Sequence, residues 1–140
     1  MKGLLALLLI AALPALAIPS EITAEYQLTN KGITIGRVNE TFSRKGDSYS
    51  ISSVTRSEGI LKVIYDEQIT LNSAGRVVAN GLQPLQFDER RARDGKRDVS
   101  ATFDWERGLM QSRFKGESSQ HQLPRETQDR ISMMYQFMHL

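Results

Sequence analysis

No cysteine occurs among the 140 residues of this chain. Disulfide scaffolds, thiolate zinc sites and cysteine nucleophiles are therefore excluded together. Histidine is scarce as well. His121 and His139 have no second histidine or carboxylate at ligand spacing on a shared element, so we predict no metal site and no cofactor. The sequence also lacks a glycine-rich phosphate loop and a nucleophile-elbow serine, so we expect no catalytic residues and a non-enzymatic protein.

The chain also lacks a strong charge of one sign. It carries 18 lysines and arginines against 16 aspartates and glutamates, a formal net charge of +2. A body so close to neutral does not generate the field that holds nucleic acid, so we expect no nucleic-acid partner. Hydrophobic residues make up 40% of the chain and charged residues 24%, which is typical of a globular fold.

A long apolar run stands at the front of the chain. Lys2 precedes it, it extends from Gly3 to Leu13, and Ala15 to Ala17 supply the small residues that a signal peptidase recognises. A membrane-spanning helix needs about 20 apolar residues, more than this run contains. We therefore predict a signal peptide over residues 1–17, cleaved after Ala17. The product is expected in the periplasm, not spanning the membrane, because exported domains without disulfides suit a bacterial envelope.

Residues 18–140 are predicted to form a single β domain. Apolar and polar residues alternate from Ile22 onward, and turn signals such as Asn30-Lys31-Gly32 recur along the chain. The apolar segment from Ile60 to Leu71 is included among the predicted strands. No helical period competes before residue 120, so the pattern predicts an antiparallel meander.

One hairpin allows a sharper prediction of strand register. A two-residue loop at Asp94-Gly95 would place Phe87 opposite Thr102 and mix apolar with polar side chains on one face. A three-residue loop, Asp94 to Lys96, places Phe87 opposite Phe103 instead. Because a slip of one residue moves every side chain to the other face, we predict an odd-numbered loop or a bulge.

The tip of this hairpin, Asp88 to Asp98, holds five basic and four acidic residues. One interpretation is an arm that contacts an anionic partner through Arg90, Arg91 and Arg93. The other is a solvated hairpin whose charges prevent edge-to-edge pairing, and both stay open.

The end of the chain predicts a helix that is apolar on most sides. Pro124, Glu126 and Asp129 give its starting signals. Its apolar residues are Ile131, Met133, Met134, Tyr135, Phe137, Met138 and Leu140. Such a helix must be buried or must cover something. The chain stops without a cap, so we expect it to be the N-terminal fragment of a longer product.

Several short motifs follow one another in a recognisable order. They are Gly32-Ile33-Thr34-Ile35-Gly36, Gly46-Asp47-Ser48-Tyr49, Gly81-Leu82-Gln83-Pro84, Phe103-Asp104 before Gly108, and Pro124 and Asp129 leading into Ser132 and Tyr135. Across most of residues 24–138 the chain resembles the exported bacterial family called domain of unknown function 3108. The resemblance implies a strongly curved, mostly antiparallel sheet in the periplasm. We therefore expect a mainly β fold, a curved meander forming an open or half barrel, with a C-terminal helix. The family offers no catalytic residues to carry over.

The leading functional hypothesis is a periplasmic binding or accessory module. Its concave apolar face would contact a lipid, an acyl chain or an envelope polymer. The candidate ligand-binding residues are Phe87, Phe103, Trp105, Met134 and Met138, and plain core packing remains the alternative for each of them.

Two other hypotheses belong to different classes. A structural or interaction module would join an envelope protein complex through edge strands or through the charged hairpin 88–98. An envelope hydrolase using Asp104 and Glu106 would lack support from any nucleophile or metal.

Overall fold

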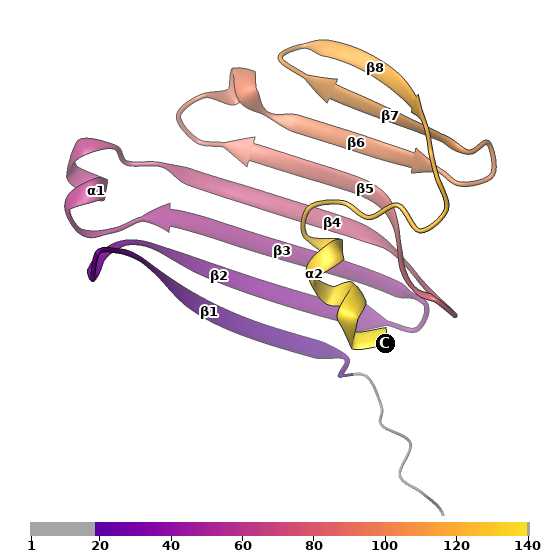
Figure 1. The fold of residues 1–140 in the computed structure, drawn as a ribbon, viewed down its shortest axis with the longest axis horizontal. Helices are drawn as coiled ribbons and strands as arrows, with labels where there is room; N and C mark the ends of the chain where they lie inside the picture. The colour runs from indigo at the N-terminus through magenta and orange to yellow at the C-terminus, as the bar shows by residue number, and fades with distance from the viewer. Residues whose placement is uncertain (1–18, 140) are drawn as a thin grey trace, which may run out of the picture.

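The computed structural model describes residues 19–139, which form one open sheet of eight antiparallel strands. Each strand is hydrogen-bonded to the next along the chain, so β1 and β8 are the two edges (Figure 1). The strands are β1 (Glu21–Asn30), β2 (Ile33–Lys45), β3 (Ser48–Ser57), β4 (Gln68–Val78), β5 (Gly81–Arg91), β6 (Val99–Asp104), β7 (Leu109–Phe114) and β8 (Glu117–Gln122). The predicted fold class, a mainly β antiparallel meander with a C-terminal helix, is confirmed. The predicted signal peptide lies outside the described residues.

After β8 the chain returns across one face of the sheet. Residues 123–139, which we call the strap, lie over this face and end in helix α2 (Ser132–Gln136) and the 3-10 turn η2 (Phe137–His139) (Figure 1). The prediction that the helix starts near Pro124 is wrong by about two turns. The chain from Pro124 to Arg130 is irregular because its polar groups bond to the sheet and to each other, as described below.

The apolar segment that follows β3 is the second correction. Its first part is the helix α1 (Gly59–Ile64) rather than a strand, so the expectation of no helix before residue 120 is wrong. The β3–β4 ladder ends at the pair Arg56 and Gln68, and the segment between them has no strand opposite it. A local helical turn satisfies its backbone instead, for example through the N–H of Tyr65, which donates to the carbonyl of Leu61 at 2.6 Å.

The register of the β5–β6 hairpin differs from the prediction by two residues. Phe87 lies opposite Ala101, not Phe103, and the connection is longer than three residues because it contains the 3-10 turn η1 (Gly95–Arg97). The Asp98 carboxylate stabilises this longer connection by accepting the backbone N–H of Arg91 at 2.9 Å. The odd-numbered connection is confirmed, and a shift of two leaves every side chain on its predicted face.

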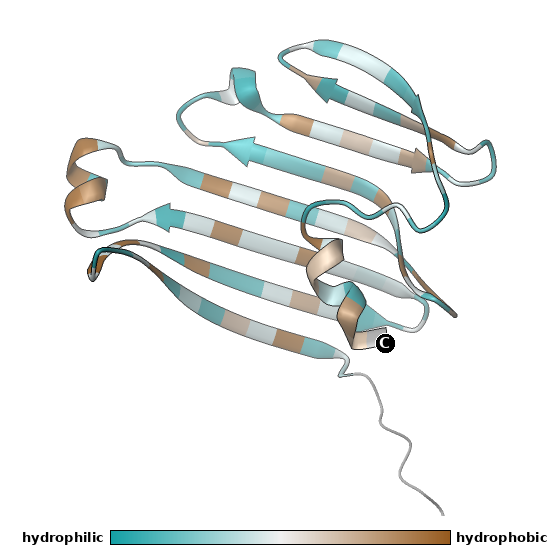
Figure 2. Ribbon diagram, viewed as in Figure 1, coloured by the Kyte–Doolittle hydropathy of each residue, from teal (hydrophilic) through white to brown (hydrophobic). Residues whose placement is uncertain are grey.

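The two faces of the sheet differ in polarity, and Figure 2 shows the alternation along the strands. The inner face, which the strap contacts, carries most of the core. The buried apolar residues are Phe42, Tyr49, Ile51, Leu82, Phe87, Ala101 and Phe103 of the sheet, with Leu123, Ile131 and Tyr135 of the strap. The outer face carries Thr41, Ser50, Ser52, Asn72 and Gln86, which are exposed or half-buried. A single sheet therefore obtains a core only because the strap covers part of one face.

Gly75 has a packing role in this arrangement. It lies at a bulge in the β4–β5 ladder. A Cβ atom there would clash with the carbonyl oxygen of Gln83 and lie 2.8 Å from Cε1 of Tyr49. The missing side chain lets the Tyr49 ring pack into the core beside Pro84.

Candidate functional site

The residues predicted to bind a ligand on the inner face fall into two groups. Phe87 and Phe103 are buried in the core cluster that includes strap residues, and Trp105 stacks on Phe103 with ring centroids 6.4 Å apart. The Trp105 indole donates to the carbonyl of Pro84 at 2.6 Å, so its polar atom is satisfied within the fold. Met138 is half-buried against the core, whereas Met134 on α2 is 64% exposed. The structure therefore brings the aromatic side chains together beneath the strap and leaves Met134 outside.

A buried hydrogen-bond chain holds the strap to the sheet. Ser73 of β4 donates to Oδ2 of Asp129 at 2.6 Å, and Oδ1 of Asp129 accepts the backbone N–H groups of Ile131 and Ser132 at 3.0 and 2.8 Å. The Tyr49 hydroxyl lies 3.1 Å from Oγ of Ser73. Because the Ser73 hydrogen is used by Asp129, Tyr49 is the donor in that contact. The carboxylate thus caps the first turn of α2 and anchors it to β3 and β4.

Further polar contacts fasten the strap along its length. The buried carboxylate of Glu89 on β5 forms ion pairs with Arg91 on its own strand, at 2.6 Å, and with Arg130 of the strap. At the end of α2, the Tyr135 hydroxyl donates to Oε1 of Glu40 at 2.6 Å. The side chains of Gln128 and Gln136 bond to the two backbone polar groups of Leu82. The strap is therefore located by specific polar groups as well as by apolar burial.

Burial raises the pKa of Tyr49 above the ordinary tyrosine range, with the nearby Asp129 adding to the shift. An unfolded tyrosine loses its proton near pH 10. The folded state therefore disfavours the phenolate, and stability is expected to fall as the pH rises above about 10. Subtracting the phenolate absorbance of the native Tyr49→Phe variant from that of the native parent chain isolates the signal of Tyr49. This signal is expected not to rise as the pH passes through about 10. The same subtraction in denaturant, where Tyr49 titrates normally, is the control. A native difference that titrates near pH 10 contradicts the burial of this hydroxyl.

The three arginines predicted to bind a partner point to different places. Arg91 is held by the buried Glu89 on the inner face. The guanidinium of Arg93 lies 4.7 Å from the centroid of the Tyr65 ring, beside α1. Arg90 pairs with Asp88 and Asp98 at 3.2 and 3.3 Å and lines a cleft. Strand alternation separates neighbouring side chains, so the three do not form one surface.

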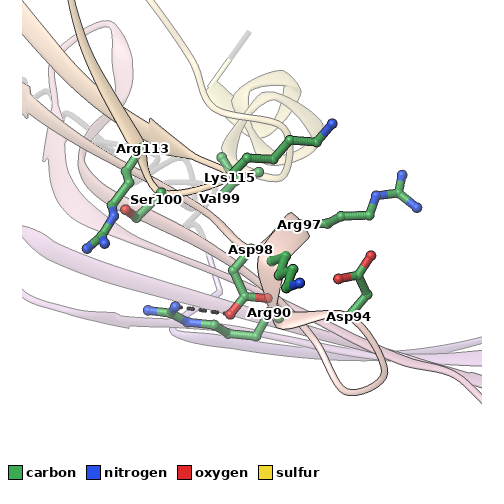
Figure 3. A pocket seen from close by; sticks show the side chains of 11 residues that line it. Arg90, Asp94, Arg97, Asp98, Val99, Ser100, Arg113 and Lys115 are labelled. Carbon is green, nitrogen blue, oxygen red and sulfur yellow. Dashed lines mark hydrogen bonds and ion pairs between the residues drawn. The ribbon is translucent and has the colours of Figure 1, made fainter.

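The cleft lies between the β5–β6 connection and the β7–β8 turn and has a volume of about 910 Å³. Figure 3 shows the side chains of Arg113 of β7 and Arg90 of β5 extending to the left of the view, and those of Lys115 of the turn and Arg97 of the connection extending to the right. The charged lining residues are Arg90, Lys96, Arg97, Arg113 and Lys115 against Asp94 and Asp98. The lining thus has five positive and two negative side chains, an excess of three positive charges. We call this the basic cleft.

One carboxylate of the basic cleft is already engaged. The backbone N–H of Arg91 and then the side chain of Arg90 hold the pKa of Asp98 below its usual range. Within residues 19–139, no ion pair involves Lys96, Arg97, Arg113 or Lys115. Lys115 is also in the left-handed region, with φ of 52°, a conformation that glycine or asparagine adopts more easily. The cleft therefore offers cations that the fold does not neutralise.

Sequence reasoning named Arg90 and included Lys96 and Arg97 in the charged hairpin 88–98, but it missed the two cations beyond that hairpin. Arg113 and Lys115 lie on the β7–β8 hairpin, and only the pairing of β6 with β7 brings them to the β5–β6 connection. Most residues of the buried hydrogen-bond chain belong to the recognised motifs, but Ser73 does not. Tyr49 comes from a motif far in the sequence from the one that holds Asp129 and Ser132, and the fold joins the two motifs through Ser73.

Two kinds of feature are absent from the described residues. No group of three or more histidine, aspartate or glutamate side chains within residues 19–139 could hold a metal ion. In the same part of the chain, no helix has the length and hydrophobicity needed to cross a bilayer. The carboxylates Asp104 and Glu106 are exposed in and beside the β6–β7 turn, where Asp104 accepts the backbone N–H of Arg107 at 2.9 Å.

Comparison with known proteins agrees with the motif order. Residues 25–140 match the family described as "Protein of unknown function (DUF3108)". No curated protein and no solved structure matches the chain. The matched region includes nearly all of the sheet, the basic cleft and the strap. The chain therefore belongs to the DUF3108 family.

Proposed function

We propose that this chain is an exported, non-enzymatic binding module that contacts an anionic component of the cell envelope through the basic cleft. The observation that carries the proposal is the set of four cations in the cleft that have no ion-pair partner in the described chain. Exposed cations gathered on one concave surface raise the local concentration of anions. The signal-peptide pattern of residues 1–17 supports export, which mass spectrometry of the secreted chain would test by a mass beginning at Ile18.

The chemistry of the cleft favours a ligand with several negative oxygens. Arg97 and Arg113 present planar guanidinium groups that match phosphate or carboxylate in two-point contacts, and the lysines add mobile point charges. Phosphate groups of a lipid headgroup or of an envelope polymer share this chemistry. The volume of about 910 Å³ exceeds that of one phosphate and fits a multiply charged group.

The apolar-face hypothesis is the weaker of the two candidates on this geometry. Phe87 and Phe103 pack in the same core cluster as Leu123 and Ile131 of the strap. An acyl chain would reach them only after the strap had been displaced. The cleft needs no such rearrangement, so it is the preferred binding site.

Titration calorimetry with inorganic polyphosphate tests the cleft. We expect the chain to bind polyphosphate at low salt and to lose affinity as salt is added, because exposed charges are screened. The double variant Arg97→Gln/Arg113→Gln is expected to bind about tenfold more weakly. Both side chains are exposed, so the fold is expected to persist.

A matched double variant at the other end of the sheet is the control. Lys45→Gln/Arg107→Gln removes the same charge from exposed positions that do not line the basic cleft. Its affinity for polyphosphate is expected to stay close to that of the parent chain. Absence of binding by the parent chain, or equal losses in the two variants, would overturn the proposed role of the cleft.

A further inference from the structure

The connections β1–β2, β3–β4, β5–β6 and β7–β8 all lie at the same end of the sheet (Figure 1). This end contains the β1–β2 turn, α1, η1 and the β7–β8 turn. Each of the four connections carries one exposed lysine. The four are Lys31, Lys62, Lys96 and Lys115. Adjacent strands lie about 4.8 Å apart, so neighbouring connections at this end are roughly 10 Å apart. The lysines therefore form a row along this end of the sheet.

Lysines are distributed unevenly between the two ends of the sheet, since only the fifth lysine of the described residues lies elsewhere. Lys45 is the last residue of β2 and lies at the opposite end. At the lysine end the carboxylates of Glu58 and Asp98 are engaged with Arg37 and Arg90. The exposed carboxylates there are those of Asp66 and Glu117, and those of Glu67 and Asp94 are half-buried. Exposed charge at this end is therefore mainly positive.

The same end carries aliphatic side chains that the fold does not bury. On α1, Ile60, Val63 and Ile64 are 57%, 82% and 73% exposed, and Ile33 beside the β1–β2 turn is 58% exposed. Figure 2 shows the brown of hydrophobic residues at α1 and at the adjacent β1–β2 turn. The backbone N–H of Glu58 donates to the carbonyl of Ile35 at 3.0 Å, which fixes α1 beside the start of β2. Exposed aliphatic groups in one place mark a contact surface.

We propose that this end of the sheet docks on an anionic lipid bilayer. The aliphatic side chains of α1 and Ile33 would enter the interface between headgroups and acyl chains. The lysine row would contact the negatively charged headgroups, as it does in interfacial segments that combine aliphatic and basic residues. This inference rests on the proposed function and names the partner: the phosphates in the basic cleft belong to lipid headgroups.

The shape of the surface favours a bilayer over a protein partner. The aliphatic residues project from α1, with Val63 the most exposed large apolar side chain of the described region. The lysines belong to four separate tips along this end of the sheet, and two of them, Lys96 and Lys115, line the basic cleft. A flat layer of negative headgroups complements a row of tips, whereas a protein partner would need a matching row of acidic sites. Lys62 lies between Leu61 and Val63 on the same short helix, so apolar and positive groups meet within one turn.

Vesicle sedimentation tests this inference on the chain that begins at Ile18, since residues 19–139 contain the whole sheet and the strap. The parent chain is expected to bind mixed phosphatidylglycerol–phosphatidylcholine vesicles about tenfold more tightly than pure phosphatidylcholine vesicles. The variant Val63→Ser/Ile64→Ser is expected to lose about tenfold in vesicle binding while it binds polyphosphate like the parent chain. Both positions are exposed, and circular dichroism verifies the fold of each variant.

Charge variants complete the experiment. Lys62→Glu is expected to weaken binding to the mixed vesicles, and Lys45→Glu, the same change at the opposite end, is expected to leave it unaltered. Binding of polyphosphate without binding of vesicles would overturn the bilayer inference and leave the proposed function standing. Binding of vesicles without polyphosphate would overturn the role of the basic cleft. Vesicle binding that is insensitive to Val63→Ser/Ile64→Ser would also overturn docking through α1.

Discussion

Replacement of Phe42 by alanine is expected to lower the free energy of unfolding by about 4 kcal/mol. Phe42 is completely buried on β2, where its ring stacks between two others. The centroid of the Tyr135 ring lies 5.0 Å away and that of Tyr49 lies 6.4 Å away, with interplanar angles of 16° and 11°. Alanine would remove both aromatic contacts and leave a cavity between the sheet and α2.

Urea unfolding followed by circular dichroism measures this effect. Phe114→Ala is the matched control, because Phe114 lies on β7 with 47% of its surface exposed and is expected to cost less than about 1 kcal/mol. Similar losses in the two variants would mean that the contact between α2 and the sheet contributes little to stability.

Asp129→Ala is expected to cost about 3 kcal/mol, because it leaves three buried donors without an acceptor. These donors are the hydroxyl of Ser73 and the backbone N–H groups of Ile131 and Ser132. The loss affects the anchor of the strap and the first turn of α2 together. Asp129→Asn retains a side-chain oxygen in the same place and is expected to cost less than the alanine variant.

The same urea experiment tests this second prediction, with Asp66→Ala as the control. Asp66 is exposed in the connection between α1 and β4, so its removal is expected to change stability by less than about 0.5 kcal/mol. Proteolysis gives an independent measurement, since loss of the anchor should expose the strap near Arg125 and Arg130. A strap that stays protected in Asp129→Ala would contradict the anchoring role of this carboxylate.

The local pattern was sufficient to predict most of the strands and the faces of those in which apolar and polar residues alternate. Alternation in segments such as Ile22 to Leu28 reflects a period of two that is set by backbone geometry alone. The prediction of an odd number of residues in the β5–β6 connection also placed Phe87 and Phe103 correctly on one face, although the register was wrong by two residues. A register shift of two residues leaves the same side chains on each face, so the hydrophobic pattern could not exclude it.

Helix α1 and the start of α2 could not be obtained from the local pattern. Ile60 to Ile64 is apolar and compatible with a strand, but no partner strand lies opposite it once the β3–β4 ladder ends at Arg56 and Gln68. The start of α2 depends on Asp129, whose Oδ1 caps the helix while its Oδ2 accepts from Ser73, a serine 56 positions earlier in the chain. Such contacts are decided by how the strands assemble and not by neighbouring residues.

The sequence by itself determined the antiparallel meander, the polarity of its faces and the absence of cysteine chemistry. Each of these follows from residue type or from spacing along a single strand. Only the tertiary structure decided which charges share a surface: it separated Arg90, Arg91 and Arg93, and it joined Arg97 to Arg113 across the basic cleft. The physical reason is that a meander places alternate connections at the same end, so residues far apart in the sequence become neighbours there.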